Sequence, residues 1–278
     1  MMTPIDLQHL YFNRGLVPDH MAIFAGWAAA SEALRGRHAP TRVQVGPKPR
    51  HILDIFEAGP TAPVHLFVHG GYWQVTDPAL HHFVAAGPLA HGITTAFAGY
   101  TLAPEASIDD IVAEIRACVI ELCRRVGRPI TISGHSAGGH LTGAMMASDW
   151  STTRAALGFD PILGGMPISG VFELEPLLKT TMNDALKLDV ASARRNSIRL
   201  WPAPAKQRAV IAVGGEESSE FLRQSRGLAV AWMASGLECA ELVVPGTNHF
   251  TVLADLAAPD GTMAKAVAAL AFDKPLGA

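Results

Sequence analysis

The sequence predicts an α/β fold, in which helices cover both faces of a mostly parallel central sheet. Short apolar segments bounded by glycine or proline alternate with helical segments along most of the 278 residues, which is typical of strands joined by crossover helices. The apolar strand at residues 130–135 leads into Gly134-His135-Ser136-Ala137-Gly138 and then a run of small residues. A Gly-x-Ser-x-Gly turn between a strand and a helix has the form of a nucleophile elbow. The composition does not break along the chain, so we expect residues 1–278 to form a single domain.

An N-terminal arm and a helix occupy residues 1–38. Pro18-Asp19 is a helix start signal, and we expect the helix to run from Asp19 to Arg37. Its predicted apolar face consists of Ile23, Phe24, Trp27, Ala30 and Leu34. Two interpretations stay open: this region only packs on the core, or the arm covers part of the site.

Three short extended segments come next, and we expect them to be successive strands at one edge of the sheet. They are residues 42–45, 51–57 and 64–68. Another strand is predicted over residues 93–98. A helix is predicted over residues 107–126, because its apolar residues share one face, Asp109 and Asp110 lie in its first turn, and Gly127 follows its end.

The second half of the chain continues this alternation. Helices are predicted over residues 137–147, 218–235 and 262–272, and strands over residues 165–172, 209–215 and 241–244. Between two of these strands lies a segment, residues 173–208, with mixed helical signals. Insertions at this place commonly cover a site, so we expect a small cap. A packing excursion without substrate contact is the alternative.

The strand at residues 64–68 runs into His69-Gly70-Gly71-Tyr72-Trp73-Gln74. Adjacent glycines after a strand let the main chain turn its N–H groups outward, as the stabilisation of an oxyanion requires. In a hydrolase with a nucleophile elbow, one donor is the residue after the nucleophile and another comes from such a loop. We therefore expect Gly70, Gly71 and Ala137 to form an oxyanion hole. The alternative is an ordinary turn.

A nucleophilic Ser136 needs a base and an acid, and with a nucleophile elbow the chain order is serine, acid, histidine. His140 and His249 are the histidines after Ser136. His140 lies one helical turn along the elbow helix, so we expect His249, in the loop after the last strand, to be the base. The acid should follow the strand that ends at Gly215. Glu217 is our first choice and Glu216 our second.

Other functions are disfavoured by composition and spacing. The net charge is -3 and the basic residues are scattered, so we expect no nucleic-acid partner. No apolar run reaches the roughly 20 residues that a membrane span needs, and the N-terminus lacks a signal peptide, so we expect a cytoplasmic protein without membrane association. The odd number of cysteines, 3, fits buried reduced thiols. His65 and His69 would lie about 13 Å apart on a strand, too far to share a metal ion; we expect no metal and no cofactor.

The combined motifs resemble those of the kynurenine formamidases (arylformamidases) with an α/β-hydrolase fold, and of related bacterial esterases. The resemblance rests on the His-Gly-Gly-Tyr-Trp-Gln run at residues 69–74, on residues 100–104, on the elbow at residues 134–140 and on Gly-Gly-Glu-Glu-Ser-Ser-Glu-Phe at residues 214–221. It covers most of the chain, from about Tyr11 to His249. It implies an α/β-hydrolase fold with Ser136 as nucleophile, His249 as base and Glu217 as acid. The family often has aspartate where this chain has Glu217.

The resemblance implies hydrolysis of N-formyl-L-kynurenine to L-kynurenine and formate through an acyl-enzyme on Ser136. Tyr72, Trp73 and Phe250 flank the predicted catalytic groups and are expected to bind the substrate ring, although they also fit core positions. A carboxylesterase for small aryl or short-acyl esters is the alternative, because the same triad serves both reactions. A hydrolase-fold binding protein without turnover is the second alternative. The expected partner is a small-molecule substrate, and a homodimer is compatible with the sequence.

Overall fold

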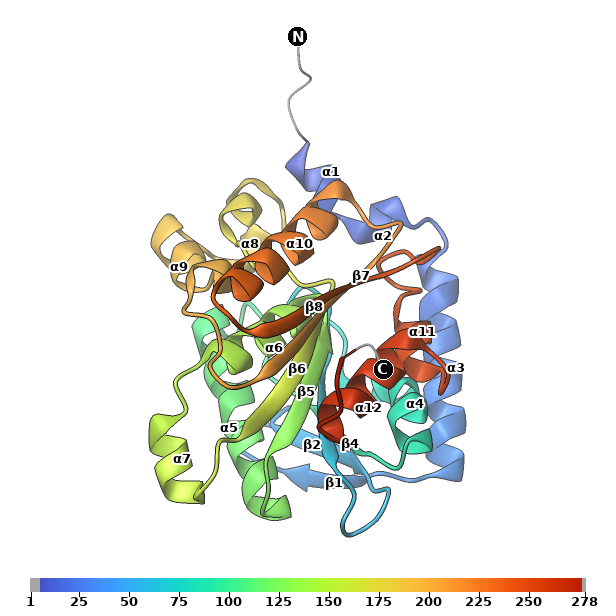
Figure 1. Cartoon of the computed structure of the whole chain (residues 1–278). Coiled ribbons are helices and arrows are strands. Elements are labelled where there is room, and N and C mark those ends of the chain that lie inside the picture. The colour runs from blue at the N-terminus through green and yellow to red at the C-terminus, as the bar shows by residue number, and fades with distance from the viewer. Residues whose placement is uncertain (1–5, 277–278) are drawn as a thin grey trace.

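The computed structural model describes residues 6–276, and its centre is one eight-stranded sheet (Figure 1). The strand order is β1-β2-β4-β3-β5-β6-β7-β8. β2 pairs antiparallel with β1 and β4, and all other neighbouring pairs are parallel. The strands are β1 Thr41–Gln44, β2 Ile52–Phe56, β3 Val64–Val68, β4 Thr94–Ala98, β5 Ile130–His135, β6 Ile162–Ile168, β7 Arg208–Gly214 and β8 Glu238–Val244. The predicted α/β-hydrolase fold with a mostly parallel sheet is confirmed.

Helices cover both faces of the sheet, as predicted, and Figure 1 shows them on opposite sides. One face carries α5 (Ile108–Val126), α6 (Ala137–Ala147) and α10 (Ser219–Ala234). The other carries α3 (His20–Arg37), η1 (Pro78–Ala85), α4 (Ala86–Ala90), α11 (Leu253–Ala257) and α12 (Thr262–Ala271). Side chains of β3 alternate between the two cores: Leu66 and Val68 join the first, and Phe67 joins the second.

α5 forms where the sequence predicts it because both of its ends are capped. The Ser107 side chain accepts from the Asp110 backbone N–H, and the Asp110 side chain accepts from the Ser107 N–H. Gly127 ends the helix at φ 65°, a left-handed conformation that glycine adopts without a Cβ clash. The chain then continues from α5 into β5, the strand that precedes the elbow.

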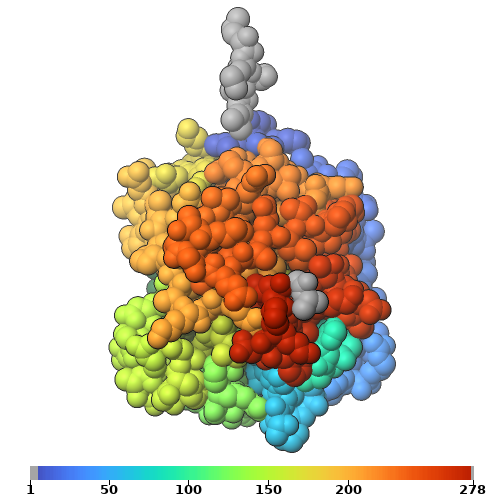
Figure 2. Space-filling view, viewed as in Figure 1, coloured from blue at the N-terminus to red at the C-terminus, as the bar shows by residue number. Residues whose placement is uncertain are grey.

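The N-terminal arm consists of α1 (Leu7–Tyr11) and α2 (Asn13–Leu16). It lies beside α10, which Figure 1 places next to α1 and which Figure 2 shows in orange below the blue arm. Three hydrogen bonds fix this contact. The Tyr11 hydroxyl donates to Glu220 Oε2 (2.7 Å) and accepts from Gln224 Nε2 (2.6 Å), and Ser218 Oγ donates to the Leu10 carbonyl (2.7 Å). The arm is therefore held to the helix that follows β7.

Several sequence-based expectations need correction. The strand at residues 64–68 lies in the middle of the sheet between β4 and β5, not at its edge. In α3, Ala30 is exposed and Ser31 is buried instead, because Ser31 Oγ donates to the Leu80 carbonyl (3.0 Å). The strand expected at residues 165–172 spans Ile162–Ile168, since the chain turns at Ser169 with φ 50°.

Smaller elements surround this frame. Four of them, η1, α4, α11 and α7 (Ser151–Leu157), were not among the elements expected from the sequence. The segment at residues 173–208 contains η2 (Glu175–Lys179), α8 (Asn183–Leu186), α9 (Val190–Arg195) and η3 (Ile198–Leu200). Within residues 6–276, none of the helices combines the length and the apolar character that a membrane crossing requires.

Candidate active site

The elbow at Ser136 is a strained turn between β5 and α6. Ser136 has φ 58°, in the left-handed region that non-glycine residues rarely adopt. The flanking glycines leave no room for a side chain: a Cβ on Gly138 would lie 2.0 Å from the Val68 carbonyl oxygen, and one on Gly134 2.4 Å from that of Gly138. Backbone packing on both sides therefore holds the serine at the carboxyl end of β5, where ligands bind in open parallel sheets.

Glu217 and His249 form a buried pair beside this elbow. They follow β7 and β8, and Glu217 Oε2 lies 2.6 Å from His249 Nδ1. A carboxylate only accepts hydrogen bonds, so the proton is on Nδ1 and Nε2 is left as the basic nitrogen. The side chains are 0% and 3% exposed, respectively. This is the arrangement by which an acid orients an imidazole base.

The second carboxylate oxygen of Glu217 is also held. Ser169 Oγ donates to Oε1 (2.5 Å), and so does the Gly214 backbone N–H (2.8 Å). Ser169 is fully buried and lies directly after β6, at the strained position noted above. Donors on two neighbouring strand ends thus fix the direction in which Glu217 faces His249.

His249 is enclosed on its other sides by two rings. Its ring centroid lies 4.5 Å from that of Phe221 and 4.6 Å from that of His135. His135 Nε2 donates to the His249 carbonyl (2.7 Å). Burial holds the pKa of His135 well below its ordinary value, so the ring stays neutral next to His249. The residue before Ser136 therefore fixes the backbone of His249, a contact that the motif alone does not indicate.

The loop after β3 presents backbone N–H groups at the elbow. A Cβ on Gly70 would lie 3.0 Å from the Ser136 Cβ, so this glycine directly adjoins the serine. Within residues 6–276 the N–H groups of Gly70, Gly71 and Ala137 donate to no backbone or side-chain acceptor. Such free donors near a nucleophile are what an oxyanion hole requires.

The carbonyl oxygens of the same peptides are held from behind. The Tyr100 hydroxyl donates to the His69 carbonyl (3.0 Å), and Thr76 Oγ1 (2.7 Å) and His69 Nδ1 (2.8 Å) donate to the Gly70 carbonyl. In a trans peptide the N–H points opposite to the C=O. Fixing these two carbonyls therefore fixes the directions of the Gly70 and Gly71 N–H groups.

Ser136 and His249 line one narrow cavity. Its volume is about 20 Å³, which is room for about one water molecule. Its wall is largely aromatic and includes Tyr72 and Phe250 from the loops, together with Phe24 and Trp27 from α3. Among residues 6–276 no hydrogen bond joins Ser136 Oγ to His249 Nε2; such bonds often tighten only when substrate binds. A substrate larger than water requires part of this wall to move.

Some predicted residues lie elsewhere. Trp73 does not line the cavity: it is 2% exposed and packs edge-on against His140 at 5.2 Å. His140 is buried in α6, and its Nε2 donates to the Asn196 carbonyl (2.8 Å). Glu216 is exposed, and within residues 6–276 it makes no hydrogen bond or ion pair with His249. None of residues 173–208 lines the cavity, whereas the arm and α3 do.

The predicted site lacks six residues that line the cavity. Three of them, Arg14, Phe24 and Trp27, come from the N-terminal region, and the others are Thr76, His81 and His135. Phe24 and Trp27 were assigned only to the apolar face of a helix, and Arg14 to no role. They lie more than 100 residues from Ser136 in the sequence. No local pattern joins segments so far apart, so the aromatic character of the helix face was the only available signal.

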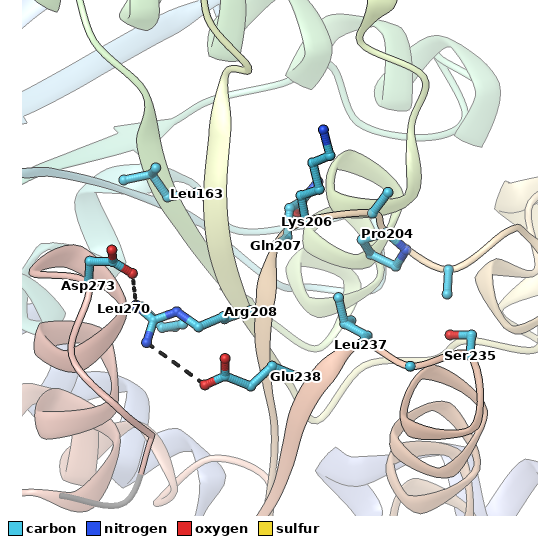
Figure 3. A pocket seen from close by; sticks show the side chains of 13 residues that line it. Leu163, Pro204, Lys206, Gln207, Arg208, Ser235, Leu237, Glu238, Leu270 and Asp273 are labelled. Carbon is cyan, nitrogen blue, oxygen red and sulfur yellow. Dashed lines mark ion pairs between the residues drawn. The ribbon is translucent and has the colours of Figure 1, made fainter.

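A larger groove of about 800 Å³ lies at the opposite end of the sheet (Figure 3). Leu163, Arg208 and Glu238 line it near the amino ends of β6, β7 and β8. Arg208 there pairs with Asp273 (3.0 Å) and Glu238 (4.0 Å). The groove has no histidine in its wall, so it lacks the imidazole that the predicted triad requires. In the part of the chain that the structure describes, no three His, Cys, Asp or Glu residues group as metal ligands.

Comparison with known proteins gives consistent similarities. Residues 65–252 match a family described as having the alpha/beta hydrolase fold. The kynurenine formamidase of Salmo salar is 32% identical over 216 residues, 73% of this chain and 72% of that protein. The kynurenine formamidase of Danio rerio is 29% identical over 214 residues, with the same coverage of 73% and 72%.

Solved structures resemble the chain over nearly its whole length. A protein from Silicibacter sp. TM1040, described as a candidate thioesterase, is 30% identical with a TM-score of 0.85, covering 95% of this chain and 99% of that one. An esterase from Pyrobaculum calidifontis has a TM-score of 0.70 at 15% identity, covering 98% and 99%. The second similarity concerns the fold alone.

Proposed function

The chain belongs to the alpha/beta hydrolase family and is a hydrolase related to the kynurenine formamidases, and from this premise we propose that it cleaves N-formyl-L-kynurenine to L-kynurenine and formate. The observation that carries the proposal is the buried Glu217–His249 pair next to Ser136 in a cavity with an aromatic wall. The pair supports serine chemistry, and Tyr72, Phe24 and Phe250 offer ring faces and edges to an aryl substrate. The formamide assignment additionally rests on the fish relatives.

The proposed reaction begins when His249 Nε2 takes the Ser136 proton. Ser136 Oγ then bonds to the formyl carbon, and the carbonyl electron pair moves onto oxygen. The N–H groups of Gly70, Gly71 and Ala137 hold this oxyanion. Glu217 stabilises the imidazolium and keeps its Nδ1–H in place.

Collapse of the tetrahedral intermediate breaks the C–N bond. The His249 imidazolium gives its proton to the leaving aryl nitrogen, and L-kynurenine departs. Water, deprotonated by His249, then attacks the formyl ester on Ser136. Formate leaves, and Ser136 regains its proton.

The test compares kcat/KM of the purified chain on N-formyl-L-kynurenine, short p-nitrophenyl esters and an acyl thioester. We expect the formamide to be preferred and Ser136→Ala to lose turnover of all three. A preference for esters or the thioester by orders of magnitude would replace the formamidase proposal with an esterase or thioesterase. Full activity of Ser136→Ala would overturn the serine mechanism itself.

A further inference from the structure

Arg14, on α2 of the arm, makes no ion pair within residues 6–276. Its guanidinium carbon lies 5.8 Å from the Tyr72 ring centroid and 5.9 Å from that of Phe24. Its Nε is buried without a hydrogen-bond partner, and within residues 6–276 no carboxylate lies within ion-pair distance of it. Residues 1–5, 277 and 278 have no acidic side chain. The side chain is thus held between aromatic rings and not by an ion pair.

Arg14 lines the same cavity as Ser136 and His249, and this cavity lacks negative charge. No Asp or Glu is in its wall, and Glu217 lies behind His249, bonded to Ser169 and Gly214. Besides Arg14 and His249, the titratable side chains of the wall are His81, His135 and Tyr72, and all three are neutral. Burial lowers the pKa of His81 to about 4 and that of His135 well below its ordinary value, and burial raises that of Tyr72.

A partly buried guanidinium without a counter-ion is costly, because removal of a charge from water must be compensated by hydrogen bonds or an opposite charge. Guanidinium offers a planar fork of donors that matches a carboxylate, and it stays charged at any physiological pH. Within residues 6–276, the wall of the cavity contains no carboxylate that could compensate the charge of Arg14. An anionic ligand in the cavity would compensate this charge.

We propose that Arg14 binds a carboxylate of the substrate, so that the enzyme selects anionic acyl compounds whose scissile bond lies at Ser136. The inference rests on the proposed function for the position of the scissile bond and extends it to the far end of the substrate. The α-carboxylate of N-formyl-L-kynurenine is a group of this class. The rings of Phe24 and Tyr72 keep the guanidinium in place, which favours arginine over lysine at this position.

The first experiment measures kcat/KM of the wild type, Arg14→Met and Arg14→Lys on N-formyl-L-kynurenine and on its carboxamide, which has the same shape without the negative charge. We expect Arg14→Met to lose roughly 10- to 100-fold on the carboxylate and less than about threefold on the carboxamide. Arg14→Lys should fall between the wild type and Arg14→Met. Arg37→Met, a change of an exposed arginine at the end of α3, is the matched control and should alter neither value.

Equal losses on both compounds would mean that Arg14 only supports Tyr72 and Phe24, and would overturn the proposal. Unchanged kinetics of Arg14→Met would overturn it as well. A second readout is binding of L-kynurenine to Ser136→Ala by calorimetry. Adding Arg14→Met should weaken this binding by a similar factor and reduce its dependence on salt.

A substrate pair of esters separates this inference from the formamidase assignment. Phenyl acetate and 3-(4-acetoxyphenyl)propanoate carry the same scissile acetyl ester, and only the second is anionic. The wild type should prefer the anionic ester, and Arg14→Met should lose that preference. If the wild type ignores N-formyl-L-kynurenine but keeps this preference, the proposed function fails and the role of Arg14 stands. If the preference is absent in the wild type, the inference fails whatever the formamidase result.

Discussion

Replacing Glu217 with glutamine tests the predicted triad through a single atom. The amide has an oxygen and an NH2 group where the carboxylate has two acceptors. The Gly214 backbone N–H and the Ser169 hydroxyl both donate to Oε1, so the amide oxygen must take that position. The NH2 group then faces His249 Nδ1 and donates to it. His249 is driven to the tautomer with its proton on Nε2, where it cannot accept the proton of Ser136.

We expect this wrong tautomer to lower kcat by about 10⁴-fold, the size of loss known for an equivalent Asp→Asn change in a serine protease. That loss corresponds to about 5.5 kcal/mol in activation free energy. The assay is steady-state hydrolysis of the preferred substrate, with thermal unfolding to check that the variant is folded. Glu216→Gln is the matched control and should change kcat less than about twofold, since surface changes are usually small. A Glu217→Gln enzyme with more than a tenth of wild-type activity would refute this reasoning, and so would an equal loss in Glu216→Gln.

Three further predictions follow from the same structure. Ser169→Ala removes one donor to Glu217 and should lower kcat about 10-fold with little change in KM, because a hydrogen bond to a charged group is worth roughly 1.5–3 kcal/mol. A variant that is less stable in denaturant unfolding but keeps the wild-type kcat would contradict this prediction. Gly138→Ala places a Cβ 2.0 Å from a backbone oxygen and should destabilise the fold by about 3 kcal/mol or more. The control Gly26→Ala, at a position with open space around it, should be neutral or slightly stabilising. Similar unfolding midpoints for the two variants would disprove the steric account. Burial lowers the pKa of His65 to about 3, so between about pH 6.5 and pH 3 the unfolded chain binds a proton that the folded chain does not. The free energy of unfolding should therefore decrease as the pH is lowered, by up to about 1.4 kcal/mol per pH unit. Denaturant unfolding at several pH values should give a pH slope smaller by that amount in His65→Gln, and equal slopes would refute this account.

Features with a local cause were predicted to within one or two residues. The helix over residues 107–126 was recognised from its periodicity, its acidic first turn and Gly127, and the structure shows α5 with a capping box over Ile108–Val126. The elbow around Ser136 is recognisable from its Gly-x-Ser-x-Gly sequence, although the backbone contact that requires Gly138 comes from Val68, which is distant in the sequence. For α5, by contrast, the residues that determine the structure are neighbours in the sequence.

Features that depend on the order of the strands or on the packing of single side chains could not be predicted. The position of β3 between β4 and β5 is a property of the sheet order, and the apolar pattern of residues 64–68 fits an edge or a centre equally well. Trp73 follows the predicted oxyanion loop directly, yet it packs in the core against His140 while Tyr72 lines the cavity. The backbone at both residues has positive φ, 56° for Tyr72 and 59° for Trp73, so the alternation of a strand does not apply to them.

The two ends of a substrate would thus be handled by two different parts of the chain. Loops at the carboxyl edge of the sheet carry Ser136, His249 and the free backbone N–H groups, and these loops follow strands of one hydrogen-bonded sheet. Arg14 belongs to an arm that is attached through Tyr11 and Leu10 to α10, whose Phe221 packs on His249. The narrow cavity must widen to admit a substrate, and the arm contributes Arg14 to its wall. If Arg14 binds the substrate carboxylate as proposed, a change in the arm alters the choice of substrate while the reaction chemistry stays the same.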